Sequence, residues 1–483
     1  MKPTNLIFIL SDQHNAAITG CYGNSIVQTP HIDSLAERGT RFASAYTPSP
    51  ICVPARASLA TGRYVHDIGY WENASPYDGA VPSWEHRLKT HGYHVDSIGK
   101  LHFRSADDDN GFVESYDAMY VVDGVGDVLS AIRQDAPIRN SRPGIEAASS
   151  GDSSYLRYDA RIAERACAWL AKHKYDEKPW VLFVSFVLPH PPYIAPQNFH
   201  DLYPSDVLPL PLQWRAEDWP RHPVITHMRR SFSFDVPFSE ETLRRLNAAY
   251  YGMCTYLDEQ IGKVLAALDD NDLTAHTRTI YTSDHGEHLG GRGIFGKFSM
   301  YDESARVPLI AAGPEIPAGR VVNTPVSLVD CFPTILESVG CSSDVDDHDL
   351  PGRSLWEIAS SEDTNRTVLS EYHAIGRERA SFMLRDQHYK YVYHVDAPEQ
   401  LFDMQSDPNE LTDLAQDSAT FNLCQSYEAQ LREMLDPEAV DVQAQTEQAA
   451  RVEQFGGREA VIRRGFFQNS PAPGESASIV RFE

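Results

Sequence analysis

The sequence predicts an α/β protein with a large, mixed but mostly parallel sheet that is flanked by helices. In the first half of the chain, short apolar runs of strand length alternate with amphipathic stretches of helical length. This alternation is typical of parallel strands joined by crossover helices. Residues 180–187 are almost unbroken apolar sequence, as expected of a central strand covered on both faces. Beyond about residue 364 the texture changes to short strands and turn-rich sequence, which predicts a smaller antiparallel sheet.

The individual elements are expected in the following order. Strands of the main sheet are predicted at residues 5–10, 93–98, 180–187 and 279–282. One helix is predicted over 31–38, where Gly39 ends it, and a long one over 240–268, where Ser239 is a suitable N-cap. The smaller sheet is expected to contain strands at residues 381–384 and 389–393.

The changes of texture divide the chain into three parts. We predict a catalytic domain over 1–363, a small α+β subdomain over 364–440 and a C-terminal tail over 441–483. Residues 105–159 are acidic, contain Gly and Ser and show little periodicity, so we expect them to be an insertion that forms the rim of a pocket. The tail is expected either to wrap a neighbouring subunit of a homo-oligomer or to be disordered.

The overall composition excludes several classes of partner. The formal net charge of −26 argues against nucleic acid and anionic membranes, because no basic patch would contact their phosphates. The apolar stretch 5–10 is too short for a signal segment or a membrane span. The seven cysteines are scattered and show no CxxC spacing, which favours reduced thiols. We therefore expect a cytoplasmic protein.

Polar residues follow two of the predicted strands at the point where each ends. The first strand runs into Asp12 and Gln13, and the strand at 279–282 runs into Asp284 and His285. Ligands of open α/β sheets bind at the carboxyl ends of the strands. Two carboxylates, an amide and an imidazole would make an oxygen-rich site for a divalent cation. Either aspartate alone is equally well explained as the cap of a following turn.

One cysteine lies in a segment of fixed pattern. The stretch from Cys52 to Arg56, followed by Thr61 and Gly62, fits C-x-P-x-R…T-G. This pattern resembles the signature of the type I sulfatase family, in which a maturation enzyme oxidises the cysteine to formylglycine. A second stretch, 92–102, is similar to the sulfatase pattern G-Y-x-T-x-x-x-G-K-x-H, although Val95 stands where Thr or Ser is usual. The alternative for Cys52 is a small buried thiol in a loop before a helix.

The resemblance extends over roughly residues 4–415 and implies an alkaline-phosphatase-like fold and one divalent cation. Its ligands would be Asp12, Gln13, Asp284, His285 and the modified Cys52. Many arylsulfatases of the family have Asp in place of Gln13 and Asn in place of His285. The set found here is more similar to those of choline sulfatases and phosphonate monoester hydrolases. The loss of one anionic ligand favours manganese over calcium as the bound ion, and both ions are candidates.

The resemblance also implies roles for several polar residues. Arg56 would bond to the formylglycine hydroxyl, Lys100 and Lys297 would neutralise sulfate oxygens, and His102 would be the base that releases sulfate. His190 would act with Lys297 on the leaving-group oxygen, and Asn73 would contact the substrate. Without the family patterns, each of these would be interpreted as a surface lysine or a hydrogen-bonded histidine. Together they would give an acidic protein a locally positive site for an anion.

The resulting hypothesis is a sulfuric ester hydrolase that cleaves an aryl or small alkyl sulfate. A formylglycine hydrate suits this reaction because one hydroxyl attacks sulfur and the second drives release of sulfate, whereas Ser or Cys would remain as a stable ester. A phosphonate monoester or phosphodiester hydrolase is the alternative. Choline sulfate is a special case that predicts an aromatic and acidic pocket, for which Trp71, Tyr77 and Tyr120 are available. An inactive binding protein on the same scaffold is the third hypothesis.

Overall fold

The computed structural model describes residues 1–361 and 365–482. Its main sheet has eight strands in the order β12-β2-β11-β9-β1-β7-β4-β5. The five strands from β9 to β5 are parallel to one another, and β11 pairs antiparallel with both β9 and β2. The strands are β1 (Asn5–Asp12), β2 (Gly39–Phe42), β4 (His94–Lys100), β5 (Glu114–Met119), β7 (Trp180–Pro189), β9 (Thr277–Ser283), β11 (Leu309–Ala312) and β12 (Arg320–Val322).

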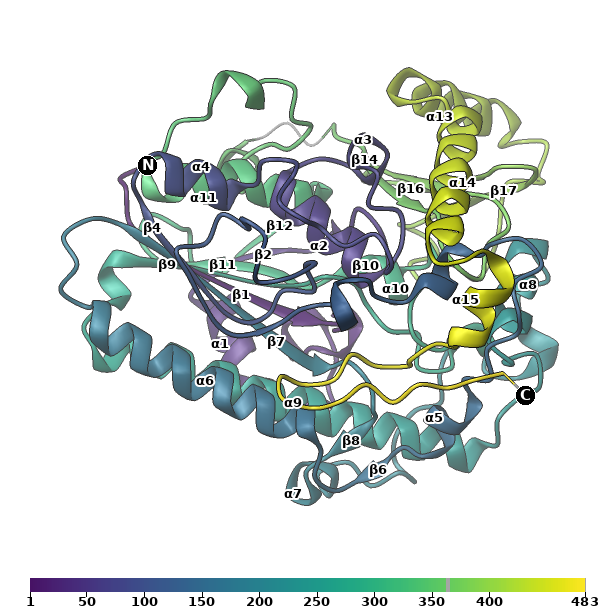
Figure 1. Ribbon diagram of the computed structural model, residues 1–483, viewed down its shortest axis with the longest axis horizontal. Helices are drawn as coiled ribbons and strands as arrows, with labels where there is room; N and C mark the ends of the chain where they lie inside the picture. Colours follow the sequence, from purple (N-terminus) through teal and green to yellow (C-terminus); the bar gives the residue numbers. More distant parts are fainter. Residues whose placement is uncertain (362–364, 483) are drawn as a thin grey trace.

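Helices cover both faces of this sheet (Figure 1). Alternate residues of β1 enter different cores, with Ile7 and Ile9 on one face and Leu6 and Phe8 on the other, because successive side chains of a strand point to opposite faces. The first face packs on α1 (Pro30–Glu37), α6 (Ser154–His173) and α9 (Glu240–Asp270). The second packs on α2 (Cys52–Thr61), α4 (Trp84–Thr90), α11 (Cys331–Val339) and α12 (Leu355–Ser360).

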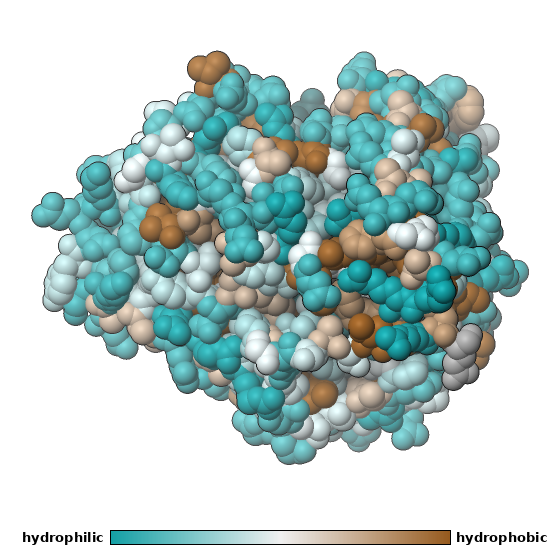
Figure 2. All heavy atoms as spheres, viewed as in Figure 1, coloured by the Kyte–Doolittle hydropathy of each residue, from teal (hydrophilic) through white to brown (hydrophobic). Residues whose placement is uncertain are grey.

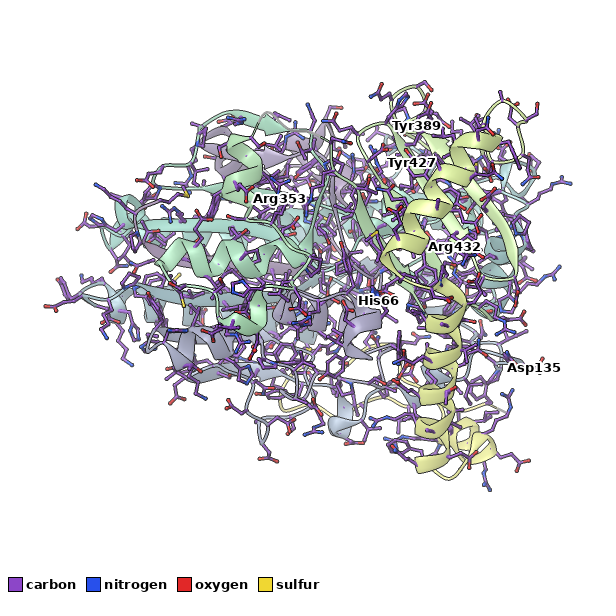
Figure 3. The ribbon with its side chains drawn as sticks, turned by 90° about the horizontal axis from the view of Figure 1, so that it is seen from above. His66, Asp135, Arg353, Tyr389, Tyr427 and Arg432 are labelled. Carbon is purple, nitrogen blue, oxygen red and sulfur yellow. The ribbon has the colours of Figure 1, made fainter. Side chains whose placement is uncertain are left out.

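A second sheet of four antiparallel strands lies beside the main domain. It consists of β14 (Val368–Tyr372), β15 (Ser381–Arg385), β16 (Tyr389–His394) and β17 (Ala397–Asp403). Helix α13 (Phe421–Met434) packs on it, and Figure 3 shows Tyr427 of this helix close to Tyr389. Lys390 connects the sheet to the main domain through an ion pair with Asp302, and it also pairs at 2.7 Å with Glu410 of its own subdomain, all three being largely buried.

Shorter elements complete the structure. Three two-residue strands form a small sheet in the order β10-β3-β13 (Arg306–Val307, Ala45–Tyr46, Val326–Ser327), and β6 (Ser149–Ser150) pairs with β8 (Ile194–Ala195). The short helices are α3 (Val65–Ile68), α5 (Arg142–Glu146), α7 (Gln197–His200), α8 (Pro223–Ser231) and α10 (Asp302–Ala305). Among the helices that the structure describes, none is both long and apolar enough to cross a membrane. The surface in view is mostly hydrophilic, with scattered apolar residues (Figure 2).

The predicted fold class is confirmed, and each predicted strand and helix is found within about two residues of its expected ends. Two segments differ from expectation. Residues 105–159 contain β5, which is the edge strand of the main sheet, and the first turn of α6. The strand was missed because β5 is mostly exposed or half-buried, so it carries no apolar pattern.

The C-terminal segment is the second difference. Residues 441–464 are mostly helical, in α14 (Pro437–Gln454) and α15 (Arg458–Arg464), rather than an irregular tail. Helix α14 begins with Asp436, whose side chain accepts a hydrogen bond from the backbone N–H of Ala439, and with Pro437 in the first turn. Residues 465–482 are largely irregular, and they run back across the main domain of the same chain (yellow in Figure 1).

Candidate active site

Four neighbouring strands of the main sheet bring polar residues to one edge. Asp12 ends β1, Lys100 ends β4, Asp284 directly follows β9 and His190 directly follows β7. Strands β9, β1, β7 and β4 are adjacent and parallel, so their carboxyl ends meet. The sheet thus collects side chains that are up to about 270 residues apart in the sequence.

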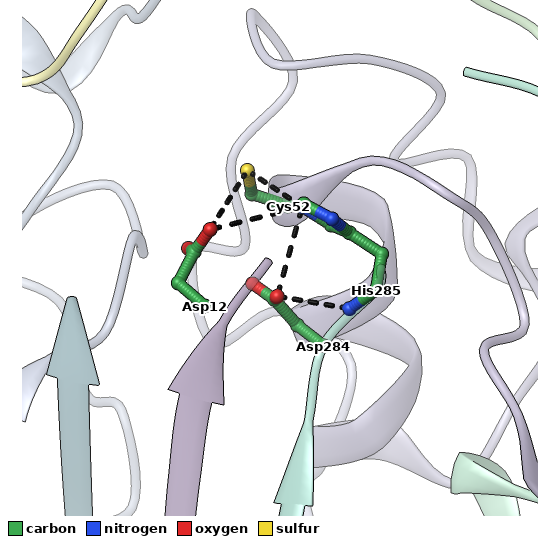
Figure 4. A group of neighbouring side chains, drawn as sticks. All are labelled: Asp12, Cys52, Asp284 and His285. Atoms are coloured by element: carbon green, nitrogen blue, oxygen red, sulfur yellow. Dashed lines mark hydrogen bonds and ion pairs between the residues drawn. The ribbon is translucent and has the colours of Figure 1, made fainter. Parts of the chain in front are cut away.

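Cys52 lies above this edge as the first residue of α2. Its Sγ is 3.2 Å from His285 Nε2, 3.9 Å from Asp12 Oδ1 and 2.9 Å from Lys297 Nζ. Figure 4 shows Asp12, Cys52, Asp284 and His285 converging from the ends of two strands and the start of the helix. The thiol is therefore held in the positive field of a helix N-terminus and beside an ammonium group.

Gly62 explains the end of the T-G pattern. It closes α2 with a φ of 67°, a left-handed conformation that favours glycine. A Cβ at this position would lie 2.8 Å from the Cβ of Phe332. Both the turn and the close approach of α11 to α2 therefore require glycine, which keeps the helix seated with Cys52 at the site.

Arg56 binds the two carboxylates from behind the thiol. Its Nε donates to Asp284 Oδ2 at 2.8 Å and its Nη2 to Asp12 Oδ2 at 3.3 Å. Burial raises the pKa of Asp12, but Lys100, His190, Lys297 and Arg56 outweigh that effect and hold it well below its usual range. Burial and the nearby Asp12 carboxylate raise the pKa of Asp284 to about 6.

The residues at this edge suit a divalent cation. Asp12, Cys52, Asp284 and His285 are all buried, and each offers one ligand atom within 4.8 Å of the others. Burial lowers the pKa of His285 to about 4, so the imidazole is neutral and has a free lone pair for a metal near neutral pH. Carboxylates are donors that manganese, magnesium and calcium accept, whereas an imidazole ligand is more typical of transition-metal ions.

Gln13 is fixed by a residue that sequence reasoning did not select. Its Oε1 accepts a hydrogen bond of 2.8 Å from Lys297 Nζ, and its Nε2 donates to Glu287. The buried Glu287 also accepts from the hydroxyl of Tyr193 at 2.8 Å. The carboxylate thus orients the amide with its oxygen toward the ammonium group that also contacts Cys52. Nothing in the sequence around Glu287 distinguishes it from a turn residue.

The cations around the thiol differ in their surroundings. Lys100 is fully buried behind Asp12, with its Nζ 2.7 Å from Asp12 Oδ2, whereas Lys297 lies at the wall of a cavity. Burial lowers the pKa of His102 and His190 well below the usual range, and the nearby lysines lower it further. Burial lowers the pKa of Lys297, but Cys52 and Asp12 outweigh this and raise it. The resting site therefore combines a charged Lys297 with neutral His102 and His190.

Three site residues have a left-handed backbone although they are not glycine. The φ angles are 69° for Gln13, 59° for His102 and 84° for Phe298. Such conformations cost on the order of 1 to 3 kcal/mol each and persist where the surrounding structure imposes them. Each of these three residues has its side chain in or next to the site. The strained backbone therefore reduces the stability of the fold but places these side chains at the site.

Five of the predicted residues line an inner cavity of about 100 Å³, whereas Lys100, which was expected to contact sulfate oxygens, does not. Its walls include Cys52, Asn73, His102, His190 and Lys297. The amide oxygen of Asn73 accepts a hydrogen bond of 3.1 Å from the backbone N–H of Val53, next to Cys52. The inner cavity adjoins an outer pocket of about 440 Å³, with which it shares His190 and Lys297.

The C-terminal segment closes one side of this cavity. Ser470 Oγ lies 2.8 Å from His102 Nε2, and the hydroxyl of Tyr155 donates to the backbone carbonyl of Ser470. Phe467 and Gln468 line both the inner cavity and the outer pocket. Trp71, Tyr77 and Tyr120 line neither. The aromatic walls are instead Tyr193 and several phenylalanines, for which the sequence predicted no substrate contact.

Basic side chains surround the buried Cys52. Such a site can bind an anionic ester and place it next to a nucleophile at this position. The chain belongs to the sulfatase family, because the family model described as Sulfatase matches residues 4–341. A second model, described as N-sulphoglucosamine sulphohydrolase, C-terminal, matches residues 286–436. The protein is accordingly a sulfuric ester hydrolase.

Individual relatives extend the likeness over most of the chain. It is 33% identical to the choline-sulfatase of Rhizobium meliloti (strain 1021) over 471 residues, which cover 93% of this chain and 90% of that protein. It is 31% identical to arylsulfatase K of Homo sapiens, over 86% of this chain and 79% of that protein. The phosphonate monoester hydrolase of Agrobacterium radiobacter has the same fold, with a TM-score of 0.71, 23% identity and coverage of 91% and 96%.

Proposed function

We propose that this protein hydrolyses an aryl or small alkyl sulfate through a formylglycine made from Cys52, with one divalent cation at the strand ends. The observation that carries the proposal is the position of Cys52. It begins α2, faces the buried group of Asp12, Asp284 and His285, and contacts Lys297. A cysteine kept only for packing would need neither the two carboxylates nor the ammonium group.

The metal is proposed to be held by Asp12, Gln13, Asp284, His285 and the oxygen of the modified residue 52. When bound, a divalent cation there would supply the positive charge that favours ionisation of a formylglycine hydroxyl. Arg56 already contacts Asp12 and Asp284. Its role is then to balance and orient the carboxylates, since one oxygen of each accepts a hydrogen bond from Arg56.

The reaction needs a proton donor for the leaving alcohol. In the first step, an oxygen on residue 52 forms a bond to sulfur while the bond between sulfur and the ester oxygen breaks. Lys297 lines the cavity and is positioned to neutralise the sulfate and the departing oxygen. The Nδ1–H group of His190 donates a hydrogen bond of 2.7 Å to the backbone oxygen of Pro191. The neutral imidazole therefore has its lone pair at Nε2. The bound anion would raise the His190 pKa and allow it to deliver a proton.

The second step needs a base. His102 lines the same cavity, and its Nε2 bonds to Ser470 while its Nδ1 is buried without a partner in the described structure. A neutral imidazole there can accept the proton of the second hydroxyl on residue 52. The bond between carbon and the sulfate oxygen then breaks, which releases sulfate and regenerates the aldehyde. The low pKa of His102 fits this role, because a protonated imidazole could not accept.

Two alternatives remain as outcomes of the test. The name of the Rhizobium meliloti relative suggests choline sulfate, but neither cavity is lined by Trp71, Tyr77 or Tyr120, the aromatic residues considered for its trimethylammonium group. A phosphonate monoester would fit the same cations, because phosphoryl and sulfuryl transfer place similar charge at the site. We expect the sulfate ester to be preferred.

A substrate panel tests the proposal on matured protein whose bound metal has been measured. The substrates are 4-nitrophenyl sulfate, the 4-nitrophenyl ester of phenylphosphonate and choline sulfate. The proposal expects kcat/KM to be highest for the aryl sulfate and to disappear on removal of the metal. A clear preference for the phosphonate would change the reaction class, and one for choline sulfate would change the substrate class.

A further inference from the structure

A buried arginine that the proposed mechanism does not use lies where the inner cavity meets the outer pocket. Arg139 lines both spaces and is 7% exposed. It lies in the loop before α5, and its backbone N–H donates to Ser231 O at 2.8 Å. The inner cavity contains Cys52, so the guanidinium faces the space that the alcohol part of a substrate must occupy.

The guanidinium of Arg139 is only partly satisfied. Nη1 pairs with Asp127 Oδ2 at 2.5 Å, whereas Nε and Nη2 are buried without a partner in the described part of the chain. The other buried arginine of the site, Arg56, has a partner for each of its three nitrogens. Unpaired buried donors are costly, and guanidinium groups bind carboxylates through two parallel hydrogen bonds. The two free groups of Arg139 are therefore suited to an oxyanion.

Other buried arginines with unpaired nitrogens do not share this position. Arg133, Arg292, Arg377 and Arg451 each have at least one, but none of them lines the inner cavity or the outer pocket. Arg139 alone of this group faces the space next to Cys52. Its two unpaired donors are buried beside this space, so a turn of the side chain would present them to a ligand bound there.

The outer pocket is apolar and free of acids. Its walls include Phe232, Phe234, Phe298 and Phe466, and the guanidinium of Arg139 lies 4.9 Å from the ring centre of Phe466. Its ionisable lining residues, within the described chain, are Arg139, His190, Lys297 and the phenol of Tyr193. Asp127, which lines the inner cavity, pairs with Arg139 through Oδ2, while its Oδ1 is buried without a partner in the described chain. In the outer pocket, a quaternary ammonium group would meet basic side chains and no carboxylate.

We infer that Arg139 binds a second oxyanion, a carboxylate carried by the alcohol part of the sulfate ester. The apolar body of that alcohol lies against the phenylalanines, and its carboxylate accepts hydrogen bonds from Nε and Nη2. Arg139 is thus a residue that determines specificity. This inference rests on the proposed function and adds the class of alcohol to it.

The test compares three aryl sulfates on matured enzyme: phenyl sulfate, 3-carboxyphenyl sulfate and 3-(trimethylammonio)phenyl sulfate. For the wild type and for Arg139→Met, kcat/KM is measured with each ester. The values for the two charged esters are then divided by the value for phenyl sulfate. Comparing the same ratio between two proteins cancels the different reactivity of the esters. The preference for the carboxylate over phenyl sulfate should fall by about 10- to 100-fold in the variant, as expected for loss of charged hydrogen bonds.

Two further variants separate recognition from damage. Arg142→Gln changes a neighbouring arginine that stacks on Phe238 at 3.8 Å and lines neither space, so the preference should be kept. Arg139→Met combined with Asp127→Asn removes the unpaired carboxylate that the single change leaves, and the preference should still be lost. Thermal unfolding shows whether each variant is folded.

The outcomes are distinguishable. Equal losses for all three sulfates in Arg139→Met, or an unchanged carboxylate preference, would overturn the inference and leave the proposed function intact. Wild-type preference for the trimethylammonio ester would also overturn it. If matured wild-type enzyme cleaves none of the sulfates, the proposed function fails first and the inference fails with it.

Discussion

The two sides of the active site differ in how they are built. On the inner side, Asp12, Lys100 and Asp284 come from the ends of adjacent parallel strands, and Cys52 from the start of a helix. On the outer side, Arg139 and Ser470 come from a loop and from the irregular C-terminal segment. Strand ends and a helix start fix the nucleophile position and the carboxylates beside it, whereas loops supply Lys297 and the contacts proposed to select a substrate. The contrast predicts large, general effects on the inner side and smaller, substrate-dependent effects on the outer side.

The largest effect is expected at Cys52. Cys52→Ser places a hydroxyl where the formylglycine would be, but lacks the second hydroxyl that releases sulfate. We expect kcat to fall by about 10⁵- to 10⁶-fold, as for the loss of other enzyme nucleophiles. Steady-state assays measure the loss, and protein mass spectrometry would reveal any sulfate retained on residue 52. A Cys52→Ser enzyme that turns over at the wild-type rate would contradict the role of this position.

A large loss of stability is expected at Arg56. Arg56→Met leaves two buried carboxylates without their shared partner, so the free energy of unfolding should fall by about 3 to 5 kcal/mol in denaturant titrations of metal-free protein. Arg63 in the same motif provides the control, because it pairs with the exposed Asp349. Arg63→Met should cost less than about 1 kcal/mol. Equal effects of the two changes would show that the inner side is not held by this ion pair.

A smaller effect is expected at Ser470. Ser470→Ala removes the hydrogen bond to His102 Nε2 and leaves the imidazole free to turn. We expect kcat to fall by about 5- to 10-fold, in line with one hydrogen bond of about 1 kcal/mol, with a changed pH profile because the environment of the His102 imidazole changes. Ser478→Ala, at an exposed position of the same segment, should have no effect. An unchanged pH profile in Ser470→Ala would mean that the segment only covers the site.

The same contrast explains what the sequence predicts. Asp12 and Asp284 each lie where an apolar run ends, and parallel strands bring such ends together. The local sequence pattern was therefore enough to predict that these two residues lie at one site. The motif around Cys52 adds a strong resemblance. Helix α14 also carried local signals, Asp436 as N-cap and Pro437 in the first turn, which were overlooked.

The outer side could not be predicted in the same way. Ser470 meets His102 across 368 residues, and the partners of Glu287 include Gln13, which lies 274 residues away. These contacts depend on how loops fold over the finished sheet, and no periodic pattern encodes that. Arg139 lies in sequence without strong periodicity, where its residue type alone gives no sign that two of its nitrogens face a cavity.

The central claim is that sulfate hydrolysis depends on the modified form of Cys52. Peptide mass spectrometry of residues 41–63 gives the fraction of chains in which the thiol has been replaced by an aldehyde. Specific activity toward an aryl sulfate is plotted against that fraction for preparations made with different amounts of the maturation enzyme. We predict a straight line through the origin. Full activity in a preparation whose Cys52 is entirely an unmodified thiol would contradict the account.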